Sequence, residues 1–102
     1  MKYAVLESFR ADYKRLSASE QDLFRKALRD FIEACERHAV DSTTGWPASL
    51  RVKDVENAAG VLEMTWSFSG PDGRATFEWI QIDGQLAVRW RRLGGHAIFK
   101  NP

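Results

Sequence analysis

The C-terminal part of the sequence gathers residues that suit a polyanionic partner. Residues 84–102 have no acidic side chain, and their basic or titratable residues are Arg89, Arg91, Arg92, His96 and Lys100. Guanidinium groups bind phosphate oxygens through paired hydrogen bonds, and an imidazole exchanges a proton near neutral pH. This combination suits a polyanion, with His96 as the candidate acid or base.

Other candidates lie on the strands that we expect before and within this segment. Chemistry at a phosphate group needs cations for the phosphoryl oxygens and side chains that take up and give back a proton. Arg74 and Arg91, with Arg89 behind them, suit the phosphate. Glu63 or Glu78 either acts as the carboxylate base or holds an arginine in place. On composition alone, such a strand face is more often a solvated surface with ion pairs.

Composition limits the class of protein. A chain of 102 residues is long enough for one two-layer domain, which we expect to span residues 1–102. Its 44% hydrophobic content predicts a core that needs neither metal nor disulfide, and Cys35 is its only cysteine. The net charge of +1 argues against a strongly basic nucleic-acid-binding protein. No signal pattern or membrane-length apolar run is visible, so we expect a cytoplasmic protein without membrane contact.

The N-terminal half predicts a strand followed by a helical hairpin. Tyr3–Glu7 is β-prone and is expected at a sheet edge. Ser8 is placed to cap a first helix, whose apolar face is formed by Phe9, Tyr13 and Leu16. Ser17 and Glu20 fit the capping box of a second helix. The apolar stripe of that helix consists of Leu23, Phe24, Ala27, Leu28, Phe31, Ile32 and Cys35.

The C-terminal half predicts strands. The expected strands are Leu50–Val55, Val61–Phe68, Arg74–Ile82 and Leu86–Leu93. Turns are expected at residues 69–73 and at Asp83-Gly84. Alternation assigns one core face to Leu62, Met64, Trp66, Phe68, Ala75, Phe77, Trp79, Leu86, Val88 and Trp90. The predicted fold is α+β, with the N-terminal strand and helical hairpin packed on one face of a three- to four-stranded, mainly antiparallel sheet.

This order of elements resembles the RelE/ParE superfamily, the small toxins of bacterial toxin–antitoxin pairs, over essentially the whole chain. The helices carry FRADYKRL and SEQDLFRKAL, and PASLRVK enters the sheet. Leu62-Glu63 and Gly73-Arg74 lie where the family has a glutamate and an arginine on paired strands. The ending RRLGGHAIF is similar to the G-x-H-x-x-(x)-F ending of YafQ-type members.

The resemblance implies an endonuclease that needs no metal or cofactor, cuts messenger RNA in the ribosomal A site and is held inactive by a cognate antitoxin. It matches Arg74 to the sheet arginine, His96 to the C-terminal acid/base and Phe99 to an aromatic residue that stacks on or orients the substrate. Arg51 and Lys53 match a basic stretch entering the sheet. The predicted catalytic residues are His96, Arg74, Arg91 and Glu63. The predicted substrate-binding residues are Arg51, Lys53, Glu78, Arg89, Phe99 and Lys100.

Two other functions stay open. Members of the ParE branch block DNA gyrase and need no catalytic residues, although the His96 context favours an endonuclease. A catalytically decayed relative would only bind a partner. Ala48 fits this last alternative, because some relatives have a carboxylate base there, and the net charge of +1 is lower than in typical RNA-cutting relatives.

Overall fold

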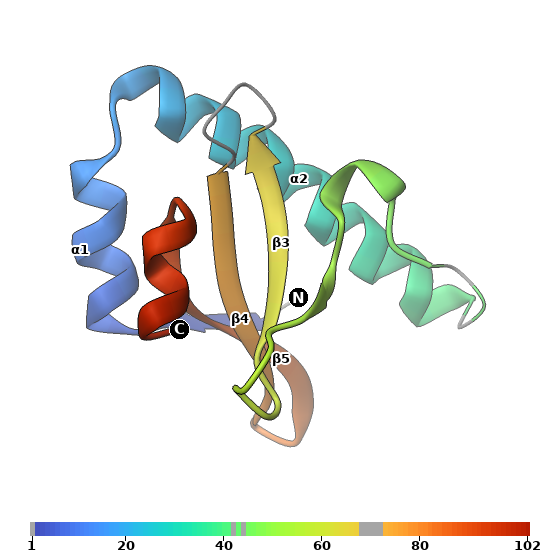
Figure 1. The fold of residues 1–102 in the computed structure, drawn as a ribbon. Helices are drawn as coiled ribbons and strands as arrows, with labels where there is room; N and C mark the ends of the chain where they lie inside the picture. Colours follow the sequence, from blue (N-terminus) through green and yellow to red (C-terminus); the bar gives the residue numbers. More distant parts are fainter. Residues whose placement is uncertain (1, 42, 44, 68–72) are drawn as a thin grey trace.

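The computed structural model describes residues 2–41, 43, 45–67 and 73–102, without the side chains of Ala39, Ser67 and His96. Phe68 and the turn predicted at residues 69–73 therefore lie outside the described residues, apart from Gly73. In chain order the elements are β1 (Lys2–Val5), α1 (Glu7–Arg15), α2 (Ala18–Val40), η1 (Ala48–Leu50), β2 (Lys53–Asp54), β3 (Leu62–Ser67), β4 (Gly73–Ile82), β5 (Gln85–Gly94) and η2 (His96–Lys100) (Figure 1).

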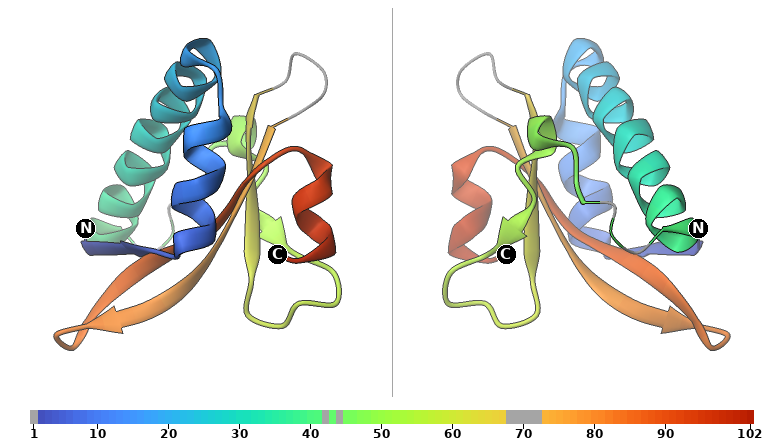
Figure 2. Two further views of the ribbon diagram at one scale, coloured as in Figure 1. Left: turned by 90° about the vertical axis from the view of Figure 1, so that its left-hand side faces the viewer. Right: turned by 90° about the vertical axis from the view of Figure 1, so that its right-hand side faces the viewer.

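The strands of the described residues form one five-stranded sheet in the order β1-β5-β4-β3-β2. β1 runs parallel to β5, and the other neighbouring strands are antiparallel. Figure 2 shows α1 and α2 on one side of the sheet and η2 on the other. The predicted α+β fold with a helical hairpin on a mainly antiparallel sheet is confirmed. The N-terminal strand does not pack on a face of the sheet as predicted: β1 pairs with β5 at the edge, which gives the sheet one strand more than the upper limit predicted.

The start of α2 is the capping box that the sequence predicts. The Ser17 hydroxyl accepts from the Glu20 N–H at 3.2 Å, and the Glu20 carboxylate accepts from the Ser17 N–H at 2.8 Å. The predicted Ser8 cap of the first helix is wrong. α1 begins two residues earlier than such a cap implies, at Glu7 with Leu6 at its N-cap, and the Ser8 hydroxyl donates to the main-chain oxygen of Arg91 instead.

An aromatic core lies between α2 and the central strands. The rings of Phe31, Phe77 and Trp90 meet with centroids 5.0 to 5.3 Å apart, mostly tilted or edge to face. Such geometries add attraction to the area that the rings bury. Phe31 also stacks on Trp46, with centroids 4.9 Å apart, so the loop after α2 is attached to the same core.

Leu23, predicted on the apolar stripe of α2, is 41% exposed, so the buried stripe begins at Phe24. Two residues predicted on the core face of the sheet are exposed as well. Leu86 is 58% exposed and Trp79 is 37% exposed. Both lie near the Asp83-Gly84 turn of the β4–β5 hairpin, which extends beyond the helices in Figures 1 and 2. Asp83 and Gly84 both have positive φ, at 53° and 75°, as the predicted tight turn requires.

The strand predicted at Leu50–Val55 shrinks to the two residues of β2. Residues 48–50 form η1, and Arg51 follows it in the left-handed conformation, with φ 46°. A left-handed residue turns the chain out of the extended path, so pairing with β3 starts only at Lys53.

Candidate functional site

The polar side chains predicted on the sheet do share one face. We call the side chains of Glu63, Thr65, Arg74, Thr76, Glu78, Arg89 and Arg91 the polar face. The register pairs Glu63 with Thr76, Thr65 with Arg74 and Glu78 with Arg89, which places each pair on the same side of the sheet. Much of this face is covered, since Thr65 and Thr76 are no more than 2% exposed.

Glu63 and Arg74 form a buried charged pair on this face. Arg74 is 8% exposed, and its Nε lies 3.7 Å from Glu63 Oε1. Lys53 Nζ, on β2, is 3.8 Å from the same oxygen. Two cations therefore neutralise Glu63 from two strands. Direct contact between Arg74 and a nucleic acid would require the covering segments to move.

Glu78 binds two arginines of β5, Arg89 and Arg91, which are more exposed than Arg74. Its Oε1 accepts from Arg89 Nε at 2.6 Å and is also approached by Arg89 Nη2. Its Oε2 accepts from Arg91 Nη1 at 3.0 Å. The carboxylate therefore fixes both guanidinium groups on one side of the sheet. Of the two roles left open for Glu78, this geometry favours the holding of arginines.

The C-terminal segment lies against this face. The main-chain oxygen of Pro102 accepts from Arg91 Nε and from Thr76 Oγ1, each at 3.1 Å. η2 carries His96, Phe99 and Lys100, so the predicted acid/base belongs to the element beside the arginines. The His96 side chain itself lies outside the described residues. Ile98 is buried, and Lys100 is exposed.

Arg51 lies in the segment that leads into β2. It is exposed at the end of η1, two residues before Lys53 begins β2. The structure thus brings together Glu78, Arg89 and Arg91 beside the C-terminal segment, and separately Lys53, Glu63 and Arg74. Their roles in binding or catalysis stay predictions.

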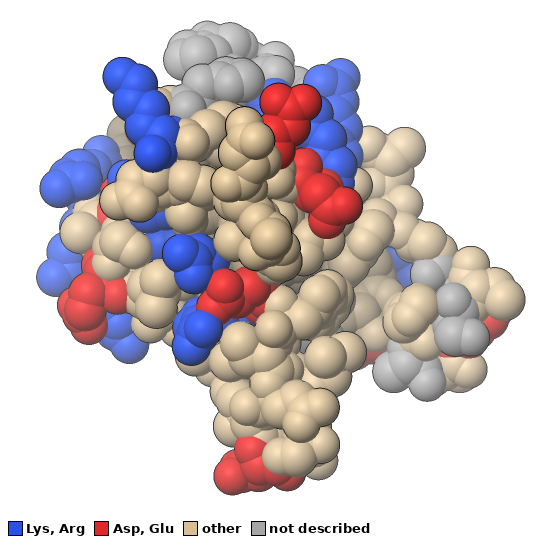
Figure 3. All heavy atoms as spheres, turned by 60° about the horizontal axis from the view of Figure 1, so that its bottom comes forward, with Lys and Arg blue, Asp and Glu red and all other residues tan. Residues whose placement is uncertain are grey.

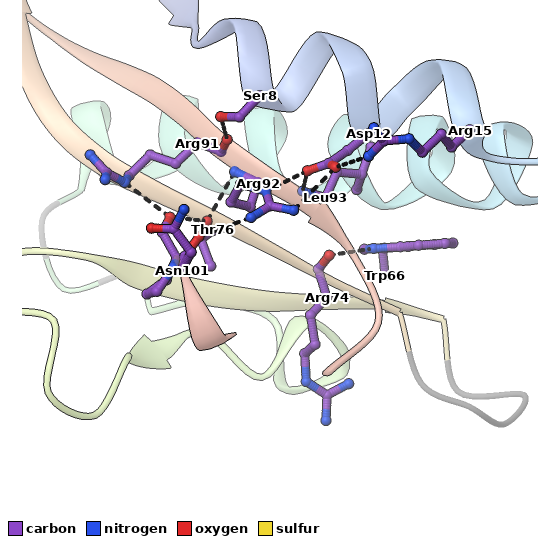
Figure 4. Close-up of polar contacts among 11 residues, drawn as sticks. Ser8, Asp12, Arg15, Trp66, Arg74, Thr76, Arg91, Arg92, Leu93 and Asn101 are labelled. Atoms are coloured by element: carbon purple, nitrogen blue, oxygen red, sulfur yellow. Dashed lines mark hydrogen bonds and ion pairs between the residues drawn. The ribbon is translucent and has the colours of Figure 1, made fainter. Parts of the chain in front are cut away.

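Sequence reasoning missed Asp12 and assigned no role to Arg92. Asp12 lies on α1 and is only 6% exposed. Its carboxylate accepts from Arg92 Nε at 2.7 Å and from the Leu93 N–H at 3.0 Å (Figure 4). This carboxylate raises the pKa of Arg92 above its ordinary value. A signal was present, because Asp12 is three residues after Phe9 and four before Leu16, on the apolar side of the helix.

Charges of both signs mix on the surface. On the face drawn in Figure 3, acidic side chains lie among the basic ones, so this face has no extended basic field. The described part of the chain holds no cluster of three or more His, Cys, Asp or Glu residues arranged to bind a metal ion. Among the described residues, no helix has the length and apolar character needed to cross a bilayer.

The strand order and the helical hairpin on one face of the sheet match a RelE-like fold. Among solved structures, the chain is similar to a YoeB/ParE toxin from Agrobacterium tumefaciens, with a TM-score of 0.56. The match covers 94% of this chain and 99% of that chain at 11% sequence identity, so it establishes the fold. No family model matches the sequence, and no curated protein does so either. The sequence resemblance is thereby confirmed for the fold.

Proposed function

We propose that this chain is the toxin of a toxin–antitoxin pair and cuts messenger RNA on the ribosome, without a metal or a cofactor. The observation that carries the proposal is the convergence of Arg89 and Arg91 on Glu78 beside the segment that bears His96. The RelE-type fold and the printed description of the Agrobacterium protein as a YoeB/ParE toxin support it. The proposed toxin domain spans residues 1–102 and acts in the cytoplasm, where translation occurs.

The chemistry assigns one role to each group. Arg91 and Arg89 neutralise the phosphoryl oxygens as charge develops on them in the transition state. His96 moves a proton to the leaving oxygen or from the attacking 2′-hydroxyl. Phe99, Lys100, Arg51 and Lys53 contact the RNA on either side of the cut. Glu63 and Arg74 have a structural role in the polar face, since both are buried.

The proposed partner that silences the toxin is its antitoxin. The isolated chain exposes Tyr3, Trp79 and Leu86, large apolar side chains that suit burial by a protein partner. These residues lie on β1 and the β4–β5 hairpin. Because side chains alternate along a strand, they are on the face of the sheet opposite to Glu78, Arg89 and Arg91. The same exposed side chains are the observation that favours the alternative of a ParE-like toxin, which acts by binding gyrase.

The test is induced expression in a bacterial host, with primer extension on translated messages. Wild-type protein should arrest growth and produce new cuts. His96→Ala should lower cleavage about 10²- to 10⁴-fold, the usual contribution of a general acid or base. Arg91→Ala should also lose cleavage. Arg37→Ala is the matched control, because Arg37 pairs with Glu33 on the exposed side of α2 and should leave cleavage unchanged.

Circular dichroism and urea unfolding of each purified variant establish that the fold is intact. Growth arrest without new cuts would refute the endonuclease and support action on gyrase, which supercoiling assays detect. A soluble, folded wild-type protein that causes no arrest would favour a relative that only binds a partner. Equal cleavage by His96→Ala and wild type would refute the role of His96.

A further inference from the structure

The β5 strand has a bulge beside the candidate site. Thr76 pairs with Arg92 and Phe77 pairs with Trp90, so Arg91 is the extra residue on β5. Two backbone N–H groups next to this bulge donate hydrogen bonds to side-chain oxygens. The Arg92 N–H donates to Thr76 Oγ1 at 3.0 Å, and the Leu93 N–H donates to Asp12 Oδ2 at 3.0 Å.

Asp12 binds the bulge from α1 in two ways. Besides the Leu93 N–H, it accepts from the Arg92 guanidinium, with Nε at 2.7 Å from Oδ2 and Nη2 at 3.3 Å from Oδ1 (Figure 4). Arg15 Nη1 approaches Oδ1 at 3.4 Å. A two-point contact between a carboxylate and an arginine fixes orientation as well as distance. The burial of Asp12 strengthens these bonds, because little water competes for them.

The bulge residues in turn hold the end of the chain. Arg92 Nη1 donates to the main-chain oxygen of Asn101 at 3.0 Å, and Arg91 Nε donates to that of Pro102 at 3.1 Å. Thr76 Oγ1 donates to the Pro102 oxygen as well, at 3.1 Å. A continuous chain of hydrogen bonds therefore runs from α1 through the bulge to the residues directly after η2.

We infer that Asp12 is a positioning residue, which orients Arg92 and thereby holds the C-terminal segment, residues 95–102, against the sheet. An effect of Asp12 on RNA cleavage rests on the proposed function, because that segment carries His96. Asp12 touches no substrate in this scheme. It acts through Arg92, and its loss should loosen the segment while the sheet keeps its pairing.

The test compares Asp12→Asn with wild type by hydrogen–deuterium exchange. The amides of Ile98 and Asn101 donate within the segment, to Gly95 and Ile98. In the variant their exchange should accelerate about tenfold or more, as expected when hydrogen bonds to a charged group are lost. Exchange in β4 should stay within about twofold of wild type. Asp22→Asn is the control, since Asp22 pairs only with Arg25 on the exposed surface of α2 among its described contacts.

Cleavage on programmed ribosomes gives the second readout. In Asp12→Asn the single-turnover rate constant should fall about tenfold, while the ribosome concentration at half-saturation stays near the wild-type value. Arg92→Lys keeps the positive charge and loses the two-point geometry, so it should reproduce both effects. This second variant decides the question if Asp12→Asn does not fold.

Wild-type exchange rates at Ile98 and Asn101 in both variants would overturn the inference. Equal acceleration throughout the sheet would also overturn it, because Asp12 would then only stabilise the fold. If wild-type protein does not cut RNA at all, the proposed function fails, and exchange in the segment alone decides whether Asp12 positions it.

Discussion

Replacement of Gly73 by alanine should destabilise the fold, and the structure indicates by how much. The Trp66 ring lies over this glycine, and a Cβ added there would be 2.3 Å from Trp66 Cε2 and 2.5 Å from Cζ2. Gly73 does not have a positive φ, so Gly73→Ala adds no backbone strain of the left-handed kind. The whole expected effect is the steric displacement of the indole.

Displacement of Trp66 would disturb two buried contacts of its ring. Its Nε1–H donates to the main-chain oxygen of Arg74 at 2.9 Å, and its ring meets Phe24 edge to face at 6.2 Å. Overpacking in a core costs about 1–3 kcal/mol. Loss of one buried hydrogen bond adds about 1 kcal/mol. Gly73→Ala should therefore lower the free energy of unfolding by about 2–4 kcal/mol.

Urea denaturation monitored by tryptophan fluorescence measures this difference. The midpoint should fall and the m-value should stay constant, because the surface exposed on unfolding hardly changes. Gly45→Ala is the control: a Cβ there has no heavy atom within 4 Å among the described residues, so stability should stay equal or rise slightly. In a Trp66→Leu background, Gly73→Ala should cost less than about 1 kcal/mol. An unchanged midpoint for Gly73→Ala would refute the reasoning.

Two further predictions concern α2. Burial raises the pKa of the Cys35 thiol to about 11, from an ordinary value of 9.0. The unfolded thiol therefore ionises first, and about 2–3 kcal/mol of stability present below pH 9 should be lost by about pH 11. Urea unfolding across this range should show the loss in wild type and a shallower one in Cys35→Ala; equal slopes would contradict it. Ser17→Ala should lower stability by about 1 kcal/mol and Ser17→Gly by only a few tenths in the same assay, and equal losses would argue against the hydroxyl cap.

The elements of the fold were predictable because burial imposes a period on each of them. The stripe of α2 from Phe24 to Cys35 repeats with the helix, and Met64, Phe77 and Trp90 alternate with polar residues along their strands. Leu86 follows the same alternation but is exposed, since the pattern assigns a face and does not tell how far the covering helix reaches.

The details of the site were less predictable because they depend on residues far apart in the sequence. The bulge at Arg91 needs an acceptor for the Leu93 N–H, and that acceptor is Asp12, 81 residues earlier. Ser8 illustrates the same limit. Its position suggested a cap, but its hydroxyl binds the main chain of Arg91 across 83 residues. Local spacing puts Asp12 on the apolar side of its helix, but it does not identify the distant partner of Asp12 or of Ser8.

Burial changes what the polar face can do. Glu63, Thr65, Arg74 and Thr76 are nearly closed to solvent, and buried charges persist only where they are paired. The inner part of this face therefore acts as a platform that carries the C-terminal segment, through contacts such as that of Thr76 with Pro102. The two arginines held by Glu78 are more accessible to a polyanion, with side chains 41% and 30% exposed against 10% for Arg74. Substitution of Arg74 consequently tests the stability of this platform first, and substitution of Arg91 is the more direct test of RNA contact.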